Sequence, residues 1–148
     1  MFTSRHARTT AIGFAALAAL TFAGAGAAQA APPDATTVPL NTGQEAPAPT
    51  EGGAHGMFTY EIDGDELCYT LEVTGLSSDA VAAHIRLAPR NVPGPVVVPL
   101  TVESDTSFVV SDCVTDADVP AIEADPTAYY VNVHTVDNMS GEVRGQLR

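Results

Sequence analysis

Short runs of alternating apolar and polar residues are the feature that most restricts how this chain can fold. In residues 56–63, Phe58, Tyr60 and Ile62 alternate with polar or small positions, and residues 66–74 continue the pattern. Successive side chains of a strand point to opposite faces, so this alternation is typical of half-buried strands. An Asp-Gly-Asp sequence between the two runs is a common hairpin turn. The sequence therefore predicts a β-hairpin here.

The last part of the chain has the same pattern. Residues 129–136 and 142–147 alternate on either side of a polar segment that contains Asn138 and Gly141. Asn and Gly tolerate the positive φ angles that tight turns need. We therefore expect a second hairpin, whose non-core face carries Asn132, His134, Glu142 and Arg144.

Further runs bring the expected total to about eight strands. Residues 81–87 place His84 and Arg86 opposite an apolar side, and three more strands are expected at residues 36–42, 95–102 and 107–114. Pro39 is expected to place the first of these three at an edge of the sheet. Thr115 with Asp118 resembles a capping box and predicts one short helix that extends to Ala124. We expect an all-β fold, an antiparallel β-sandwich or barrel of about eight strands with at most one short helix.

The beginning of the chain has the pattern of a secretory signal. A basic start with Arg5 and Arg8 precedes an Ala-rich apolar run, and Ala28-Gln29-Ala30 is a typical cleavage sequence. A membrane anchor is the alternative, which Gly and Thr residues within the run disfavour. We expect residues 1–30 to be a signal peptide cleaved near Ala30, residues 31–37 a flexible leader, and residues 38–148 one secreted, extracellular domain.

The charge of the expected mature chain restricts its partners. It keeps four Arg, no Lys and all 18 acidic residues, which gives a formal charge of −14. Such a surface repels phosphate backbones and anionic lipids, so we expect no nucleic-acid partner and no membrane partner after cleavage. The two cysteines, Cys68 and Cys113, are expected to form a structural disulfide, because an even number in an exported chain favours pairing.

The sequence closely resembles the CHRD domain, named for the growth-factor antagonist chordin. The resemblance lies in Ala83-His84-Ile85-Arg86, Gly94-Pro95-Val96-Val97, and residues 129–135 and 141–147. It spans roughly residues 38–148 and implies an all-β extracellular module without implying an activity. The family's first block usually reads His-x-His, whereas Arg86 stands at the second histidine position here.

Two functional interpretations follow. The first is a non-enzymatic binding or surface-interaction module for an extracellular protein or glycan, without a cofactor. Its expected binding face consists of His84, Arg86, Asn132, His134, Glu142 and Arg144, and we expect Arg144 to pair with a carboxylate and His134 with a polar neighbour. The alternative is a metal-binding or redox protein that holds Cu or Zn with His84, His134 and His55. Arg86 weighs against it, because a guanidinium is not a metal ligand and repels a cation.

Overall fold

The computed structural model describes residues 35–148. The expected signal peptide and most of the expected leader lie outside these residues. The strands are β1 (Thr36–Asn41), β2 (His55–Asp63), β3 (Glu66–Thr74), β4 (Ala80–Leu87), β5 (Val96–Leu100), β6 (Phe108–Thr115), β7 (Tyr129–Thr135) and β8 (Val143–Gln146). The helical elements are α1 (Val119–Ala124) and two 3₁₀ turns, η1 (Thr42–Gln44) and η2 (Pro126–Ala128).

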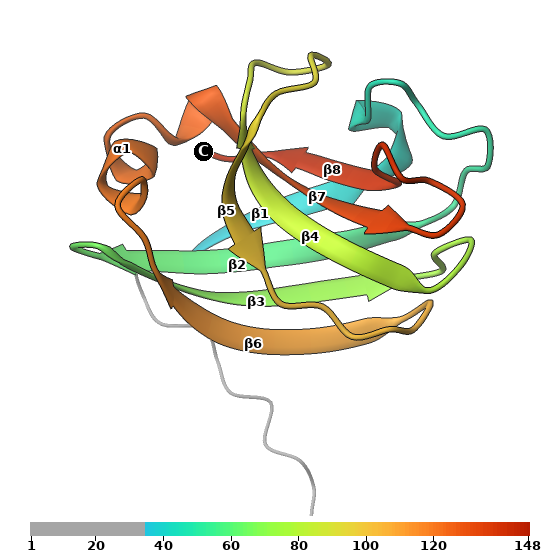
Figure 1. The fold of residues 1–148 in the computed structure, drawn as a ribbon, viewed down its shortest axis with the longest axis horizontal. Helices are drawn as coiled ribbons and strands as arrows, with labels where there is room; N and C mark the ends of the chain where they lie inside the picture. Colours follow the sequence, from blue (N-terminus) through green and yellow to red (C-terminus); the bar gives the residue numbers. More distant parts are fainter. Residues whose placement is uncertain (1–34) are drawn as a thin grey trace, which may run out of the picture.

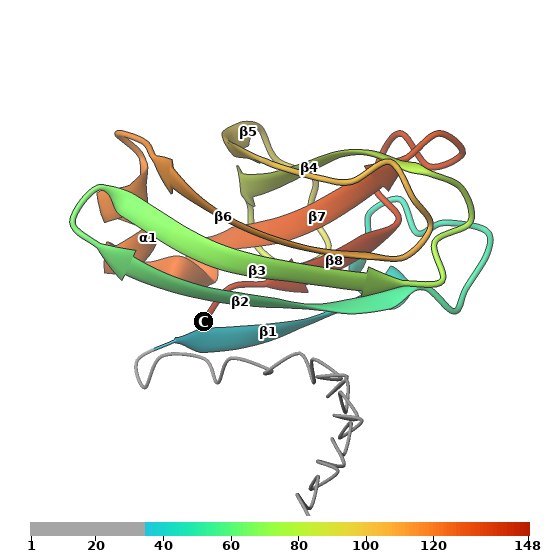
Figure 2. The same cartoon turned by 90° about the horizontal axis from the view of Figure 1, so that it is seen from below.

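All eight strands form one antiparallel sheet in the order β5-β4-β7-β8-β1-β2-β3-β6. The sheet curls into a nearly closed barrel with two halves that face each other, and α1 lies at one end (Figure 1, Figure 2). The prediction of an all-β barrel or sandwich with one short helix is therefore confirmed. No helix within residues 35–148 has the length and apolar character needed to cross a membrane.

The alternating residues fill the barrel as expected. Phe58 on β2, Leu71 on β3, Ile85 on β4 and Val131 on β7 are each 0% exposed. Burying one such side chain contributes roughly 1.5–3 kcal/mol. The hairpin between β2 and β3 turns at Gly64, whose φ of 65° is costly for residues with a side chain. The hydrophobic pattern thus determines which face of each strand points inward.

Three local expectations need correction. β1 begins at Thr36, so the last two residues of the expected leader belong to the sheet. Pro39 was expected to place the first strand at an edge, but β1 lies between β2 and β8. The proline is tolerated because the register of β1 with β8 is limited to Asn41 opposite Arg144. Finally, Thr115 ends β6, and the N-cap of α1 is Asp118, without a side-chain capping bond.

Candidate functional site

Three neighbouring strands, β4, β7 and β8, carry most of the expected binding residues on their outer face. His84 lies opposite Asn132, and Asn132 lies opposite Arg144. In the next row, Arg86 lies opposite Tyr130. Glu45 reaches this face from the loop after η1. We call the group the outer polar cluster, and its members are Glu45, His84, Arg86, Tyr130, Asn132, His134, Arg144 and Gln146.

Most of the outer polar cluster is covered. Asn132 and Arg144 are 1% exposed and His134 is 4% exposed, while His84 and Arg86 are partly buried. Glu142, the remaining expected member of the binding face, is also buried. The expectation that these side chains form an exposed face is therefore wrong for four of the six. The covering segments are the loop that carries Glu45 and the loop between β4 and β5.

Arg144 is the main support of the loop between β4 and β5. Its guanidinium donates to the carbonyl oxygens of Pro89 and Val92, each at 2.9 Å, and lies 3.4 Å from the centroid of the Tyr130 ring. It also donates to the side-chain oxygen of Gln146 at 3.2 Å. All these acceptors are neutral, so the expected pairing with a carboxylate is wrong. Burial lowers the pKa of Arg144, and the guanidinium is held by carbonyl and π contacts.

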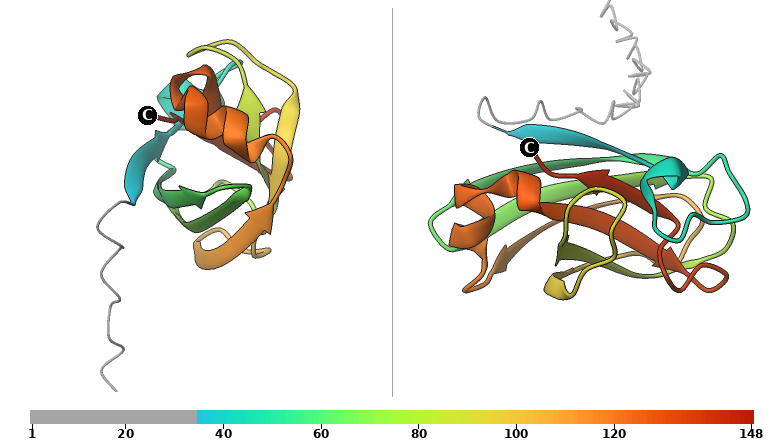
Figure 3. Two further views of the ribbon diagram at one scale, coloured as in Figure 1. Left: turned by 90° about the vertical axis from the view of Figure 1, so that its left-hand side faces the viewer. Right: turned by 90° about the horizontal axis from the view of Figure 1, so that it is seen from above.

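Three more cluster residues bind the same loop. Arg86 donates to the carbonyl oxygen of Gly94 at 2.9 Å, and the amide of Gly94 donates to the Tyr130 hydroxyl at 3.1 Å. Gln146 donates to the carbonyl oxygen of Ala88 at 2.9 Å. The loop is thus fixed at both ends and at its middle by side chains from three strands. Figure 1 and Figure 3 show it projecting beyond the ends of β4 and β5.

Glu142 lies outside this arrangement. Its carboxylate accepts hydrogen bonds from the Ser77 amide at 2.7 Å, the Ser77 hydroxyl at 2.8 Å and the Thr135 hydroxyl at 2.7 Å. The side-chain amide of Asn138 adds a fourth bond at 3.2 Å. A carboxylate with four donors is well satisfied even when buried. Glu142 therefore joins the β3–β4 connection to the turn between β7 and β8.

His84 and His134 converge as expected, with ring centroids 5.0 Å apart. Both nitrogens of His134 are already in contact with oxygens, Nδ1 with the Met139 carbonyl at 3.0 Å and Nε2 with the Asn132 side chain at 3.1 Å. The expectation that His134 pairs with a polar neighbour is confirmed. Neither nitrogen is free to turn toward a metal ion beside His84 without breaking one of these contacts.

His55 does not join the two other histidines. It lies opposite Asn41, and Asn41 lies opposite Arg144, so four strand spacings separate His55 from His84. At about 4.8 Å per spacing this is roughly 19 Å along the sheet. The expected third ligand is therefore wrong. Within residues 35–148, the one group of three potential metal ligands is Glu66 with Cys68 and Cys113.

Cys68 and Cys113 are bonded to each other, which confirms the predicted disulfide. The bond joins β3 to the edge strand β6 at a directly opposed pair of positions. Cys68 is partly exposed and Cys113 is exposed. Since both sulfurs are used, this group of three is a structural cross-link and not a metal site.

Glu45 is a member of the cluster that the sequence did not reveal. It is 6% exposed, and burial raises its pKa to about 7, although Asn132, Arg144 and Arg86 act in the opposite direction. The close approach needs Gly141 (φ 125°), because a Cβ there would overlap the Glu45 carboxylate and the Asn132 amide. The oxygen Oε1 of Glu45 and the nitrogen Nδ2 of Asn132 are buried without a hydrogen bond.

The proton states of Glu45 and His134 are connected through Asn132. Burial lowers the pKa of His134 to about 4, so its ring is neutral at neutral pH and carries one N–H. A neutral ring can donate to only one of the two oxygens that its nitrogens contact, the Met139 carbonyl oxygen and the Asn132 side-chain oxygen. The same Asn132 side chain lowers the pKa of Glu45, so Asn132 lies between the two titrating groups.

These two pKa shifts change stability in opposite directions. Between about pH 4.5 and 7 the folded protein keeps the Glu45 proton that the unfolded chain has lost, so stability falls as the pH rises. Between about pH 4 and 6.5 the unfolded chain binds a proton at His134 that the folded protein excludes, so stability rises with pH. In the overlapping range the two contributions largely cancel.

Separating the two contributions gives a testable prediction. Relative to the unmodified protein, Glu45→Gln is expected to gain stability as the pH rises from 4.5 to 6.5, and His134→Gln is expected to lose it. Each difference amounts to at most about 3 kcal/mol, and urea unfolding at a series of pH values measures it. If the free energies of unfolding of the two variants changed with pH in the same direction, the pKa values of Glu45 and His134 would not be shifted in opposite directions.

Residues 36–147 match the family model of the CHRD domain. The chain belongs to the CHRD family. The match begins with β1 and ends one residue after β8, so it covers the whole sheet of the domain. No curated protein and no solved structure matches the chain significantly.

The surface of this CHRD domain is divided by charge. Residues 80–102, which form β4, the following loop and β5, contain no Asp or Glu, although the chain has 18. Within residues 35–148, six of the eight exposed large apolar side chains lie on these elements or on the adjacent β7–β8 turn, namely Val81, Leu87, Val92, Val96, Val136 and Met139. We call β4, β5 and their connecting loop the β4–β5 face. Exposed apolar groups gathered on one side commonly mark an interaction surface.

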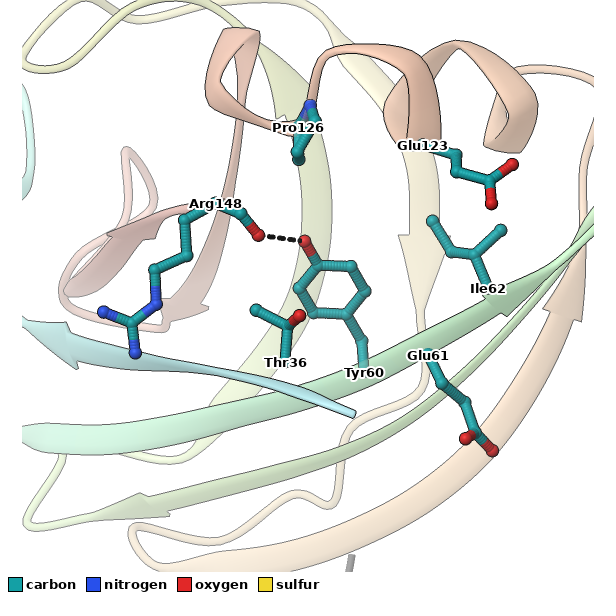
Figure 4. A pocket seen from close by; sticks show the side chains of 7 residues that line it. All are labelled: Thr36, Tyr60, Glu61, Ile62, Glu123, Pro126 and Arg148. Atoms are coloured by element: carbon teal, nitrogen blue, oxygen red, sulfur yellow. Dashed lines mark hydrogen bonds between the residues drawn. The ribbon is translucent and has the colours of Figure 1, made fainter. Parts of the chain in front are cut away.

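A hollow of about 300 Å³ lies elsewhere, between β2 and the α1–η2 segment. Figure 4 shows Tyr60 and Ile62 pointing into it and Glu61 pointing to the other side of the strand. The Tyr60 hydroxyl donates to the carbonyl oxygen of Arg148 at 2.9 Å. None of the candidate site residues expected from the sequence lines this hollow, and the Tyr60 hydroxyl is already bonded.

Proposed function

We propose that this CHRD domain is a non-enzymatic extracellular binding module that docks a partner through the β4–β5 face. The observation that carries the proposal is the coincidence of exposed apolar side chains with a segment, residues 80–102, that contains no Asp or Glu, on a protein that is otherwise strongly acidic. Charge repulsion over the rest of the surface and apolar contact on this face favour one docking orientation.

The loop between β4 and β5 supports this proposal because it is pre-organised. It exposes Val92, which is 45% exposed, while Arg144 holds the carbonyl oxygens of Pro89 and Val92 from beneath. A loop already held in one conformation loses less entropy on binding, which improves affinity. The outer polar cluster then acts as the support of a contact loop, and its members need no exposure to contribute to binding.

A protein is a better partner for this face than a glycan. The six aromatic side chains of residues 35–148 are all buried, and they are Phe58, Tyr60, Tyr69, Phe108, Tyr129 and Tyr130. No exposed Phe or Tyr ring of the described residues is therefore available to stack on a sugar. Exposed Val and Leu side chains beside Arg90 suit an apolar protein surface that carries a carboxylate.

The extracellular location rests on three observations. Family membership and the disulfide both favour an oxidising compartment, and the signal-like start of the chain agrees with export. We propose that the domain is not an enzyme because its covered polar side chains already form hydrogen bonds with the loop between β4 and β5. These side chains belong to Arg86, Tyr130, Arg144 and Gln146.

Two matched substitutions test the proposal. Val92 is 45% exposed on the β4–β5 face, and Met57 is 42% exposed on β2, in the other half of the barrel. Labelled mature domain is incubated with cells and culture medium of the producing organism, and saturable retention is measured. We expect Val92→Asp to weaken retention roughly tenfold or more, which corresponds to about 1.4 kcal/mol, and Met57→Asp to leave it unchanged.

The reverse result would contradict the proposed face. If Met57→Asp abolished retention and Val92→Asp did not, the partner would dock on the acidic half. Equal losses would indicate a general effect of added negative charge. Thermal melting of both variants establishes that each remains folded, since neither substitution removes a buried contact.

A further inference from the structure

β6 is an edge strand whose free side is poorly protected. The strand order ends with β5 on one side and β6 on the other. β5 has five residues and contains Pro99, two features that discourage further pairing. β6 has eight residues without Pro, Lys or Arg, and its register with β3 is continuous. Of the two edges, β6 is therefore the one able to accept another strand.

The disulfide reveals which backbone groups of β6 face the free side. Cys68 and Cys113 are directly opposed with Cα atoms 4.0 Å apart, close to the roughly 4.5 Å of a non-hydrogen-bonded pair. In such a pair the N–H and C=O groups point away from the partner strand. The Cys113 amide accordingly donates to its neighbour Asp112 at 2.8 Å and not to β3. Every second residue of an antiparallel strand points its amide to the same side, so the amides of Val109 and Ser111 also face the free side.

These two amides have no competing partner within the described chain. The nearby segment 101–107 bonds elsewhere, since Asp105 and Thr106 accept hydrogen bonds from the amides of Ala80 and Leu76. Thr101 reaches β6 through its hydroxyl, which donates to the Asp112 carboxylate at 2.6 Å. Val109 is 60% exposed and Ser111 is exposed. An exposed edge with open amides is the template for strand addition by another chain.

The charge around β6 selects the kind of strand that fits. Residues 51–85 and 101–125, which include β2, β3 and β6, contain no Lys or Arg. Glu72 lies opposite Val109, and Asp112 lies within β6 itself. A second copy of this chain would bring its own acidic residues to the same place, so self-pairing is disfavoured. A strand with cationic side chains is attracted.

We propose that the free edge of β6 binds an extended basic segment of a partner protein by antiparallel strand addition. Backbone bonds to Val109 and Ser111 fix the segment, and its Lys or Arg side chains face the carboxylates on the outer side of β2 and β3, among them Glu72 opposite Val109. This surface is separate from the β4–β5 face, so each can fail without the other.

A peptide probe tests the proposal. The probe is a peptide of about seven residues that alternates lysine and valine, the usual length of one strand. Its binding to the mature domain is followed by NMR, with the amides of Val109 and Ser111 expected to shift. Ser111→Pro removes one free-edge amide without removing a bond to β3, and it is expected to weaken binding roughly tenfold. Ser111→Ala, which keeps the amide, is expected to bind as the unmodified domain does.

Two outcomes would overturn the proposal. Equal binding by Ser111→Pro and Ser111→Ala would show that the peptide is held by general attraction to an acidic surface. Absence of binding at about 1 mM, which corresponds to about −4 kcal/mol, would show that the edge accepts no strand. Val109→Pro serves as a second edge variant if Ser111→Pro does not fold.

Discussion

Replacing both Cys68 and Cys113 by serine is expected to lower the free energy of unfolding by about 4 kcal/mol. The disulfide closes a loop with a sequence separation of 45 residues, and the chain-entropy model gives this value for a loop of that size. In a domain of this length the melting temperature is expected to fall by roughly 15 °C. The loss affects the pairing of β6 with β3 first, because β6 has no strand on its other side.

Urea unfolding of the double variant, and of the unmodified domain under reducing conditions, measures this effect. The two are expected to agree, since both remove the same cross-link. A loss below about 1 kcal/mol in both would mean that residual structure already restricts the unfolded chain nearly as much as the disulfide does.

Replacing Arg144 by alanine is also expected to be severe, at about 4 kcal/mol. The substitution removes a fully buried guanidinium and leaves the carbonyl oxygens of Pro89 and Val92 without their donor. It also removes the contact with the Tyr130 ring. Deleting one member of a buried charged network typically costs about 3–5 kcal/mol, because the remaining polar groups lose their partners.

Arg90→Ala is the matched control for Arg144→Ala. Arg90 lies on the same loop and is exposed, with a bond of 3.2 Å to the side-chain oxygen of Gln44. Its removal is expected to change the free energy of unfolding by less than about 0.5 kcal/mol. Similar losses for the two variants would mean that the burial of Arg144 contributes little, contrary to the role that we assign to it.

The alternating pattern predicted the sheet because it reports which side of a strand faces the core. Phe58 and Leu71 could be placed inside from the sequence, and Cys68 and Cys113 could be paired from their number and setting. The pattern does not report what covers the other side. Asn132 and Arg144 were correctly placed on the outer face, but the loops that bury them follow no hydrophobic period.

The remaining errors have the same origin. Glu45 lies in a loop rich in Gly, Pro and Thr, where a buried carboxyl has no signal in the sequence. His55 was grouped with His84 because it lies in a loop that was expected to reach the other histidines, whereas the strand order places four spacings between them. Strand order depends on long-range pairing, which local periodicity does not contain. One signal was available in advance, namely the absence of acidic residues from 80 to 102.

The claim that the outer polar cluster holds a pre-organised contact loop is tested most directly by amide hydrogen exchange. The Val92 amide donates to the Pro89 carbonyl at 3.2 Å, and the Gly94 amide donates to the Tyr130 hydroxyl at 3.1 Å. We predict that both exchange at least roughly tenfold more slowly than in an unstructured peptide, although Val92 is exposed. In Arg144→Ala both are expected to accelerate beyond the change at Phe58 in the core. Exchange of Val92 and Gly94 at peptide rates in the unmodified domain would contradict the account, because the loop would then not be held.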